Sequence, residues 1–176
     1  MNKISKLIIK KTNKNNFWFF GFLVSILALG VWAVFQPGFM NADAIVIYSQ
    51  AKTGNYQDWH PPIMAFTLKV FFDLGIGLKE LMFIQCQLAY VGLYLSIYQL
   101  LKILKVNASA FISFFTIVGF TLPFSPFPFY AMGFIKDSWH MIFLLWTIGL
   151  SIYLYRENSV SENSLKKHVV LISIIF

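Results

Sequence analysis

The sequence predicts an all-α membrane protein with four transmembrane helices and a truncated fifth, and two observations support this prediction. The 176 residues are 58% hydrophobic and only 12% charged, and a typical soluble domain carries about 25% charged residues. The apolar residues also gather into runs of about 20 residues, the length at which a helix crosses the hydrocarbon core of a bilayer. We therefore expect a single transmembrane domain over residues 1–176.

The apolar runs define the expected elements along the chain. Residues 1–16 are expected to form a basic tail. The predicted spans are residues 17–35, 81–101, 108–124 and 138–155, and a fifth span starts at residues 168–176. The predicted outer loops are residues 36–80 and 125–137. The first run is too long for a signal peptide and no small-residue cleavage site follows it, so it is expected to stay as an anchor. Because the chain ends inside an apolar run, where a carboxylate is costly, we expect an N-terminal portion of a longer protein.

The positions of the cations predict the orientation in the membrane. The formal net charge is +7, but the lysines and the arginine lie at the ends of apolar runs, without the basic face that nucleic-acid binding needs. Segment 62–78 is interrupted by Lys69 and Asp73 and is expected to lie along the outer surface. Ten of the fourteen cations then face the cytoplasm, as the positive-inside rule requires. This predicts a multi-pass protein of the bacterial plasma membrane with a cytoplasmic N-terminus.

The first outer loop is expected to contain two surface helices. Asn41 is a candidate N-cap for a helix that runs to about Lys52 and ends at Gly54. Two prolines then favour the start of a second helix over about residues 63–73. Apolar residues on that helix would face the membrane surface, and a lysine and an aspartate four positions apart would pair on it.

The second outer loop combines prolines with charges. Pro123, Pro126 and Pro128 predict that this segment is not helical. Lys136 and Asp137 come directly before the fourth span, where Asp137 or the following serine is a candidate N-cap. An acid at the mouth of a span is expensive unless it faces water or a partner, so Asp137 is expected to face the outer aqueous phase.

The order of these features forms a recognisable pattern. An anchor helix is followed by a loop with an acid in its first helix, the stretch DWHPP at residues 58–62, a surface helix, a span, and a second loop with an acid after a lysine. This order, over residues 17–155, resembles the GT-C superfamily of integral-membrane glycosyltransferases, which contains the protein mannosyltransferases and the aminoarabinose lipid A transferases. The resemblance implies transfer of a sugar from a polyprenyl-phosphate donor to a lipid, glycan or protein acceptor at the outer membrane face.

The resemblance also implies roles for individual residues. Asp43 and Asp137 match the acids of the family and are expected to be catalytic, with a carboxylate taking the proton of the acceptor. The expected substrate-binding residues are Lys136, His60, Asp58 and His140. Each also has a structural alternative, such as a solvated surface acid for Asp43, an N-cap for Asp137 and an interfacial anchor for Lys136. Some family members use a divalent metal, but no metal-ligand spacing assigns one here.

Two other classes of function stay open. A small non-enzymatic multi-span protein, acting as an assembly partner or polyprenyl-lipid binder, explains the spans and basic ends equally well but gives the outer acids no role. A transporter needs ionisable groups inside its spans, where Gln85, Gln87 and Gln99 are the most polar residues. The transferase interpretation requires that Asp43 and Asp137 share one aqueous compartment and converge on one cavity at the membrane surface.

Overall fold

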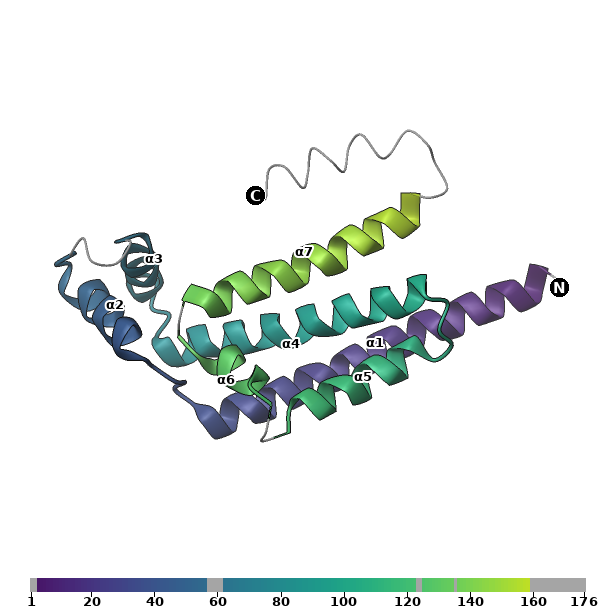
Figure 1. Ribbon diagram of the computed structural model, residues 1–176, viewed down its shortest axis with the longest axis horizontal. Helices are drawn as coiled ribbons and strands as arrows, with labels where there is room; N and C mark the ends of the chain where they lie inside the picture. Colours follow the sequence, from purple (N-terminus) through teal and green to yellow (C-terminus); the bar gives the residue numbers. More distant parts are fainter. Residues whose placement is uncertain (1–2, 57–61, 123–124, 135, 159–176) are drawn as a thin grey trace.

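The computed structural model describes residues 3–56, 62–122, 125–134 and 136–158, and this part of the chain consists of helices joined by turns and loops, with one isolated β-bridge. The helices are α1 (Lys3–Phe35), α2 (Ala42–Thr53), α3 (Pro62–Asp73), α4 (Leu78–Ile103), α5 (Ser109–Phe120), α6 (Phe127–Met132) and α7 (Lys136–Asn158). Helices α1, α4, α5 and α7 lie side by side as a bundle (Figure 1). Helices α2 and α3 lie beyond one end of it, which we call the hairpin end.

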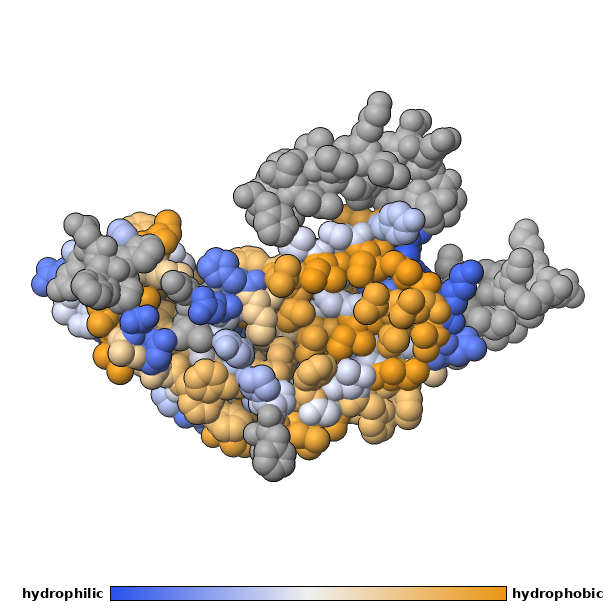
Figure 2. Space-filling model, viewed as in Figure 1, coloured by the Kyte–Doolittle hydropathy of each residue, from blue (hydrophilic) through white to orange (hydrophobic). Residues whose placement is uncertain are grey.

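Three stretches of the described chain are long and apolar enough to cross a membrane: Asn15–Phe35, Leu78–Ile103 and Asp137–Arg156. They correspond to the spans predicted at 17–35, 81–101 and 138–155. The bundle presents large apolar side chains outward, and Trp18, Val34 and Phe143 are each more than 60% exposed. Figure 2 shows this apolar surface along the bundle, with hydrophilic residues gathered toward its ends. The fold is therefore compatible with a membrane protein. The predicted fifth run lies outside the described residues.

Helix α4 lies at the centre of the bundle and contacts α1, α5, α6 and α7. Its polar side chains hydrogen-bond to backbone carbonyl groups of neighbouring helices. Cys86 Sγ donates to Ala28 O at 3.4 Å, and Gln87 Nε2 donates to Ser25 O at 3.1 Å, both on α1. Polar side chains commonly join membrane helices in this way, because hydrocarbon offers them no other partner.

Two glycines allow α4 and α7 to approach closely. A Cβ atom on Gly92 would lie 2.8 Å from the indole of Trp146, and one on Gly149 would lie 2.9 Å from the side chain of Leu95. The Trp146 indole N–H donates to Leu88 O at 2.9 Å, which fixes the ring against α4. Small residues at helix interfaces bring backbones together in the same manner in many membrane proteins.

The predicted span over residues 108–124 differs most from the structure. Helix α5 covers only Ser109–Phe120, about 18 Å at 1.5 Å per residue, which is shorter than the bilayer core of about 30 Å. Tight turns continue the chain, with Leu122 N donating to Gly119 O at 3.2 Å and Ser125 N donating to Leu122 O at 2.9 Å. Three membrane-length helices are described, where four complete spans were expected.

The expectation that prolines exclude a helix from the second loop is wrong. Helix α6 begins directly after Pro126, its N-cap, and contains Pro128 in its first turn. First-turn N–H groups have no partner inside a helix, so proline costs nothing there. The start of the next helix also differs, because α7 already begins at Lys136. Asp137 and Ser138 therefore lie inside the helix, and neither is its N-cap.

Helix α2 forms as its flanking residues predict. Asn41 is the N-cap, and its side-chain oxygen accepts the backbone N–H of Ala44 at 2.8 Å. Gly54 follows the last turn with φ +73°, and its N–H donates to Gln50 O. A left-handed glycine is the common way to end a helix. Asp43 is thereby fixed in the first turn of α2.

Helix α3 packs on α2 and has two apolar faces. Lys69 Nζ lies 3.2 Å from Asp73 Oδ1, as the spacing predicted. One face of α3 is buried through Ala65 and Leu68. The other is an exposed apolar stripe at helical spacing formed by Ile63, Phe66 and Val70, which Leu74 extends just after the helix. Such a stripe is typical of helices that lie in a membrane interface.

Candidate functional site

A short parallel β-bridge joins the two segments that were expected to be outer loops. Phe39, just before α2, donates its N–H to Met132 O at 2.9 Å, and its own carbonyl accepts the N–H of Phe134 at 2.9 Å. These bonds pair Phe39 with Gly133, just before α7. The start of α2 and the start of α7 are therefore held together by backbone atoms of segments about 94 residues apart.

Two residues support this bridge. Gln85 reaches it from α4, and its Nε2 donates to Ala131 O at 3.2 Å and to Gly133 O at 2.8 Å. Gly38 adopts φ +111°, and a Cβ atom there would lie 2.7 Å from Met132 O. Both the backbone angle and the close approach therefore require glycine. The polar position predicted inside the second span thus anchors the bridge to the bundle.

The bridge places the two candidate catalytic acids at the same end of the molecule. Asp43 lies in the first turn of α2 and Asp137 in the first turn of α7, and both are exposed. Each is four residues beyond its bridge residue, Phe39 or Gly133. Since a chain spans at most about 3.6 Å per residue, each acid's Cα lies within roughly 14 Å of its bridge residue. Both exposed acids therefore lie at the hairpin end of the bundle.

The other candidate residues are only partly described. His140 is exposed on α7, three positions after Asp137 and so on the same side of the helix. Lys136 begins α7, and the description of this residue covers its backbone alone. Asp58 and His60 lie outside the described residues. The structure thus groups Asp137 and His140 on one helix turn, with Lys136 directly before them.

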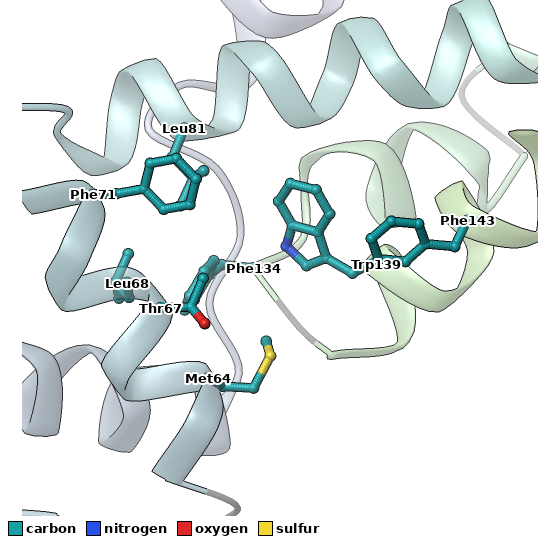
Figure 3. A pocket seen from close by; sticks show the side chains of 8 residues that line it. All are labelled: Met64, Thr67, Leu68, Phe71, Leu81, Phe134, Trp139 and Phe143. Atoms are coloured by element: carbon teal, nitrogen blue, oxygen red, sulfur yellow. The ribbon is translucent and has the colours of Figure 1, made fainter. Parts of the chain in front are cut away.

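An apolar cavity of about 280 Å³ opens between α3 and α7, beside this turn (Figure 3). Its lining comes from four parts of the hairpin end: Met64, Thr67, Leu68 and Phe71 of α3, Leu81 of α4, Phe134 of the bridge, and Trp139 and Phe143 of α7. In Figure 3 the ring of Trp139 extends from α7 toward α3. Neither candidate acid lines the cavity. Their convergence on one cavity therefore stays a prediction.

The chemistry of the cavity favours hydrocarbon. Thr67 carries the only hydroxyl of its lining, and this group already donates to Ile63 O at 2.7 Å. The volume is slightly below the range of about 300–1,000 Å³ for small-molecule sites, which suits part of a lipid chain. On α7, Trp139 lies between Asp137 and His140 in sequence. The cavity therefore borders the helix turn that carries these two exposed residues, although residues two positions apart on a helix do not share a face.

Buried polar atoms without a hydrogen-bond partner also occur at this end. Within the described ranges they are both amide atoms of Gln50, Oε1 of Gln85 and Oγ of Ser138. These residues lie on α2, beside the bridge and in the first turn of α7. An unpaired buried polar atom costs about 1–3 kcal/mol, and such atoms in native proteins call for an explanation such as a functional role. They add to the reasons for locating the functional site here.

Metal ligands and known relatives give no further assignment. Among the residues whose side chains are described, no three His, Cys, Asp or Glu side chains are grouped as metal ligands would be. No protein-family model matches the chain, and no curated protein or solved structure is significantly similar to it. The sequence pattern identified neither the bridge nor the cavity, although glutamine at position 85 in an apolar run was a signal for a buried polar contact.

Proposed function

We propose that the chain is a GT-C-type membrane glycosyltransferase that moves a sugar from a polyprenyl-phosphate donor to a lipid, glycan or protein acceptor. The reaction takes place at the hairpin end, which faces the outside of the cell membrane, and the N-terminus of α1 is cytoplasmic. The observation that carries this proposal is the apolar cavity whose α7 wall, at Trp139, belongs to the same helix turn as Asp137 and His140. A lipid-linked sugar has the same combination of hydrocarbon and polar parts.

The arrangement suggests where the donor binds. The first isoprene units enter the cavity between α3 and α7, where Leu68, Leu81 and Phe134 are each less than 4% exposed. The phosphate then lies at the start of α7, next to Lys136 and His140. An ammonium group is a suitable partner for a phosphate there. The exposed apolar stripe of α3 supports this arrangement, because it keeps the cavity at the membrane interface.

The chemical step needs a base and a stabilised leaving group. Asp43 takes the proton of the acceptor hydroxyl or amine while that atom bonds to the anomeric carbon of the sugar. The bond between the anomeric carbon and the phosphate oxygen breaks, and polyprenyl phosphate leaves with the electron pair. Lys136 stabilises the charge of the leaving phosphate, and Asp137 orients the sugar. The transfer inverts the anomeric carbon and requires no covalent enzyme intermediate.

A second candidate is a non-enzymatic protein that binds polyprenyl lipids. The almost entirely apolar lining of the cavity favours it as much as it favours the transferase. The two candidates differ in the role of the acids, because a lipid carrier needs neither Asp43 nor Asp137 for binding. Measurements of lipid binding and of sugar release on the same variants therefore distinguish them.

The test measures both properties in membranes that contain the protein. Radiolabelled polyprenyl-phosphate sugars report transfer through the release of polyprenyl phosphate, and a photoreactive polyprenyl phosphate reports binding. We expect Asp43→Asn, which removes the general base, to lower release by about 10²–10⁴-fold. Asp137→Asn, which removes the group that orients the sugar, should also lower release, and labelling should be retained in both variants. Thr67→Trp, which fills the cavity, is expected to abolish labelling.

Asp73→Asn is the matched control. Asp73 is also an exposed acid at the hairpin end, but it pairs with Lys69 on the surface of α3, and such pairs contribute about 0.3–0.5 kcal/mol. The Asp73→Asn variant should release polyprenyl phosphate at the wild-type rate. Unchanged release in Asp43→Asn and Asp137→Asn contradicts the transferase. Labelling without any release by the wild-type protein supports the lipid binder instead.

A further inference from the structure

Two cations from different helices lie together at the end of the bundle opposite the hairpin end. Lys102 is in the last turn of α4, and Arg156 is in the last turn of α7. Both are partly buried, and Arg156 hydrogen-bonds to Gln99, which lies three positions before Lys102 on α4. Each terminates a helix that is long and apolar enough to cross a membrane. The pair therefore lies at the depth where such helices meet lipid head groups.

The structure holds both side chains in place. Arg156 Nη1 donates a hydrogen bond to Oε1 of Gln99, whose side chain is only 3% exposed. Lys102 Nζ lies 5.5 Å from the ring centroid of Tyr98. Because residues three and four positions apart share a helix face, Tyr98, Gln99 and Lys102 form one surface of α4 to which Arg156 is attached. Because the Lys102 and Arg156 side chains are already held in place, a ligand would lose little binding free energy in ordering them.

Two like charges held side by side repel, and an anion shared between them removes that repulsion. Arginine and lysine are the side chains that bind phosphate, arginine through a planar fork and lysine as a point charge. Basic sites between membrane helices recognise phospholipid head groups for this reason. The pair is thus suited to a phosphate group shared by the two helices.

The neighbouring side chains indicate that this phosphate carries hydrocarbon. The last turn of α4 and the residue after it expose Leu100, Ile103 and Leu104 by 49%, 41% and 63%. An anion in water would gain nothing from these side chains, whereas an acyl chain would cover them. We propose that Lys102 and Arg156 together bind the phosphate of an anionic phospholipid in the leaflet at this end of the bundle. This site does not depend on the proposed transferase activity.

The test uses the full chain in nanodiscs and measures the lipids that remain bound after release into detergent, by native mass spectrometry. Phosphatidylglycerol is the probe and phosphatidylcholine is the neutral comparison. We expect the Lys102→Gln/Arg156→Gln double variant to bind phosphatidylglycerol about 25-fold more weakly, from roughly fivefold for each cation at a membrane surface. The single variant Lys102→Gln leaves the Arg156–Gln99 hydrogen bond intact and should bind phosphatidylglycerol about fivefold more weakly. If the double variant fails to fold, this single variant still tests the proposal.

Lys52→Gln/Lys79→Gln is the matched control. Both lysines also lie over aromatic rings, Lys52 over Tyr48 and Lys79 over Trp32, but at the hairpin end. The control removes the same charge and should leave phosphatidylglycerol binding unchanged. Equal losses in both double variants would show a general charge effect and overturn the site. Retention of phosphatidylcholine equal to that of phosphatidylglycerol would also overturn the proposal. Full displacement of phosphatidylglycerol by excess inorganic phosphate would overturn it too, because it would show a site for free anions.

Discussion

The contact between Gly92 and Trp146 gives a sharp test of the packing between α4 and α7. An alanine Cβ at position 92 would lie 2.8 Å from both Cδ1 and Nε1 of Trp146, where carbon atoms normally pack at about 3.5–4.0 Å. The indole must therefore move by roughly 0.7–1.2 Å. Its hydrogen bond to Leu88 O, now 2.9 Å, would then exceed the usual limit.

The expected cost combines three contributions. Overpacking costs about 1–3 kcal/mol and the lost hydrogen bond about 1 kcal/mol, while alanine gains up to about 1 kcal/mol in helix propensity over glycine. Gly92→Ala should therefore lower the free energy of unfolding by about 1–3 kcal/mol. Gly30→Ala in α1 is the matched control, because a Cβ at Gly30 meets no atom within 4 Å. Its stability should be unchanged or slightly higher.

The assay is unfolding by sodium dodecyl sulfate in mixed micelles, followed by circular dichroism. A double-mutant cycle adds Trp146→Ala, which removes the ring that the new methyl group strikes. Gly92→Ala should then cost little in the Trp146→Ala background, giving a coupling energy of about 1 kcal/mol or more. Identical stabilities for Gly92→Ala and Gly30→Ala would refute the close packing of α4 on α7.

Two further predictions concern the β-bridge. Gln85→Leu removes both hydrogen bonds to the bridge carbonyls and should lower the free energy of unfolding by about 1–3 kcal/mol. Hydrogen exchange at the backbone N–H groups of Phe39 and Phe134 should become faster. Gln99→Leu, at the other end of α4, is the control and should leave that exchange unchanged. Gly38→Ala introduces a side chain at φ +111° and 2.7 Å from a carbonyl oxygen, so it should cost at least about 1 kcal/mol in a denaturant titration. A neutral Gly38→Ala would contradict the bridge geometry.

The parts of the fold that could be predicted from the sequence are those encoded locally. Apolar runs of about 20 residues identify membrane-length helices, because length and hydropathy are properties of a single segment. The N-cap at Asn41 and the glycine at position 54 identify the ends of α2 for the same reason. The helical spacing of Lys69 and Asp73 likewise predicts their ion pair.

The parts that could not be predicted depend on contacts between distant residues. The pairing of Phe39 with Gly133 joins two segments whose sequences have no strand pattern, so no local feature of the sequence predicts this pairing. The cavity exists because α3, α4 and α7 meet at one end of the bundle. The prolines of the second loop predict a break in helical structure, but Pro128 lies in the first turn of α6, where proline is compatible with a helix.

The bridge between Phe39 and Gly133 also determines which sequence changes the hairpin end can tolerate. Its two hydrogen bonds use main-chain atoms alone, so any residues that keep the local backbone path preserve them. The spacing from each paired residue to the Cα of its acid is set by the number of residues and the backbone path between them. Side-chain replacements between each paired residue and its acid, except at the N-cap Asn41, should therefore leave the relative positions of the two helix starts unchanged, whereas inserting a single residue before either helix would change them.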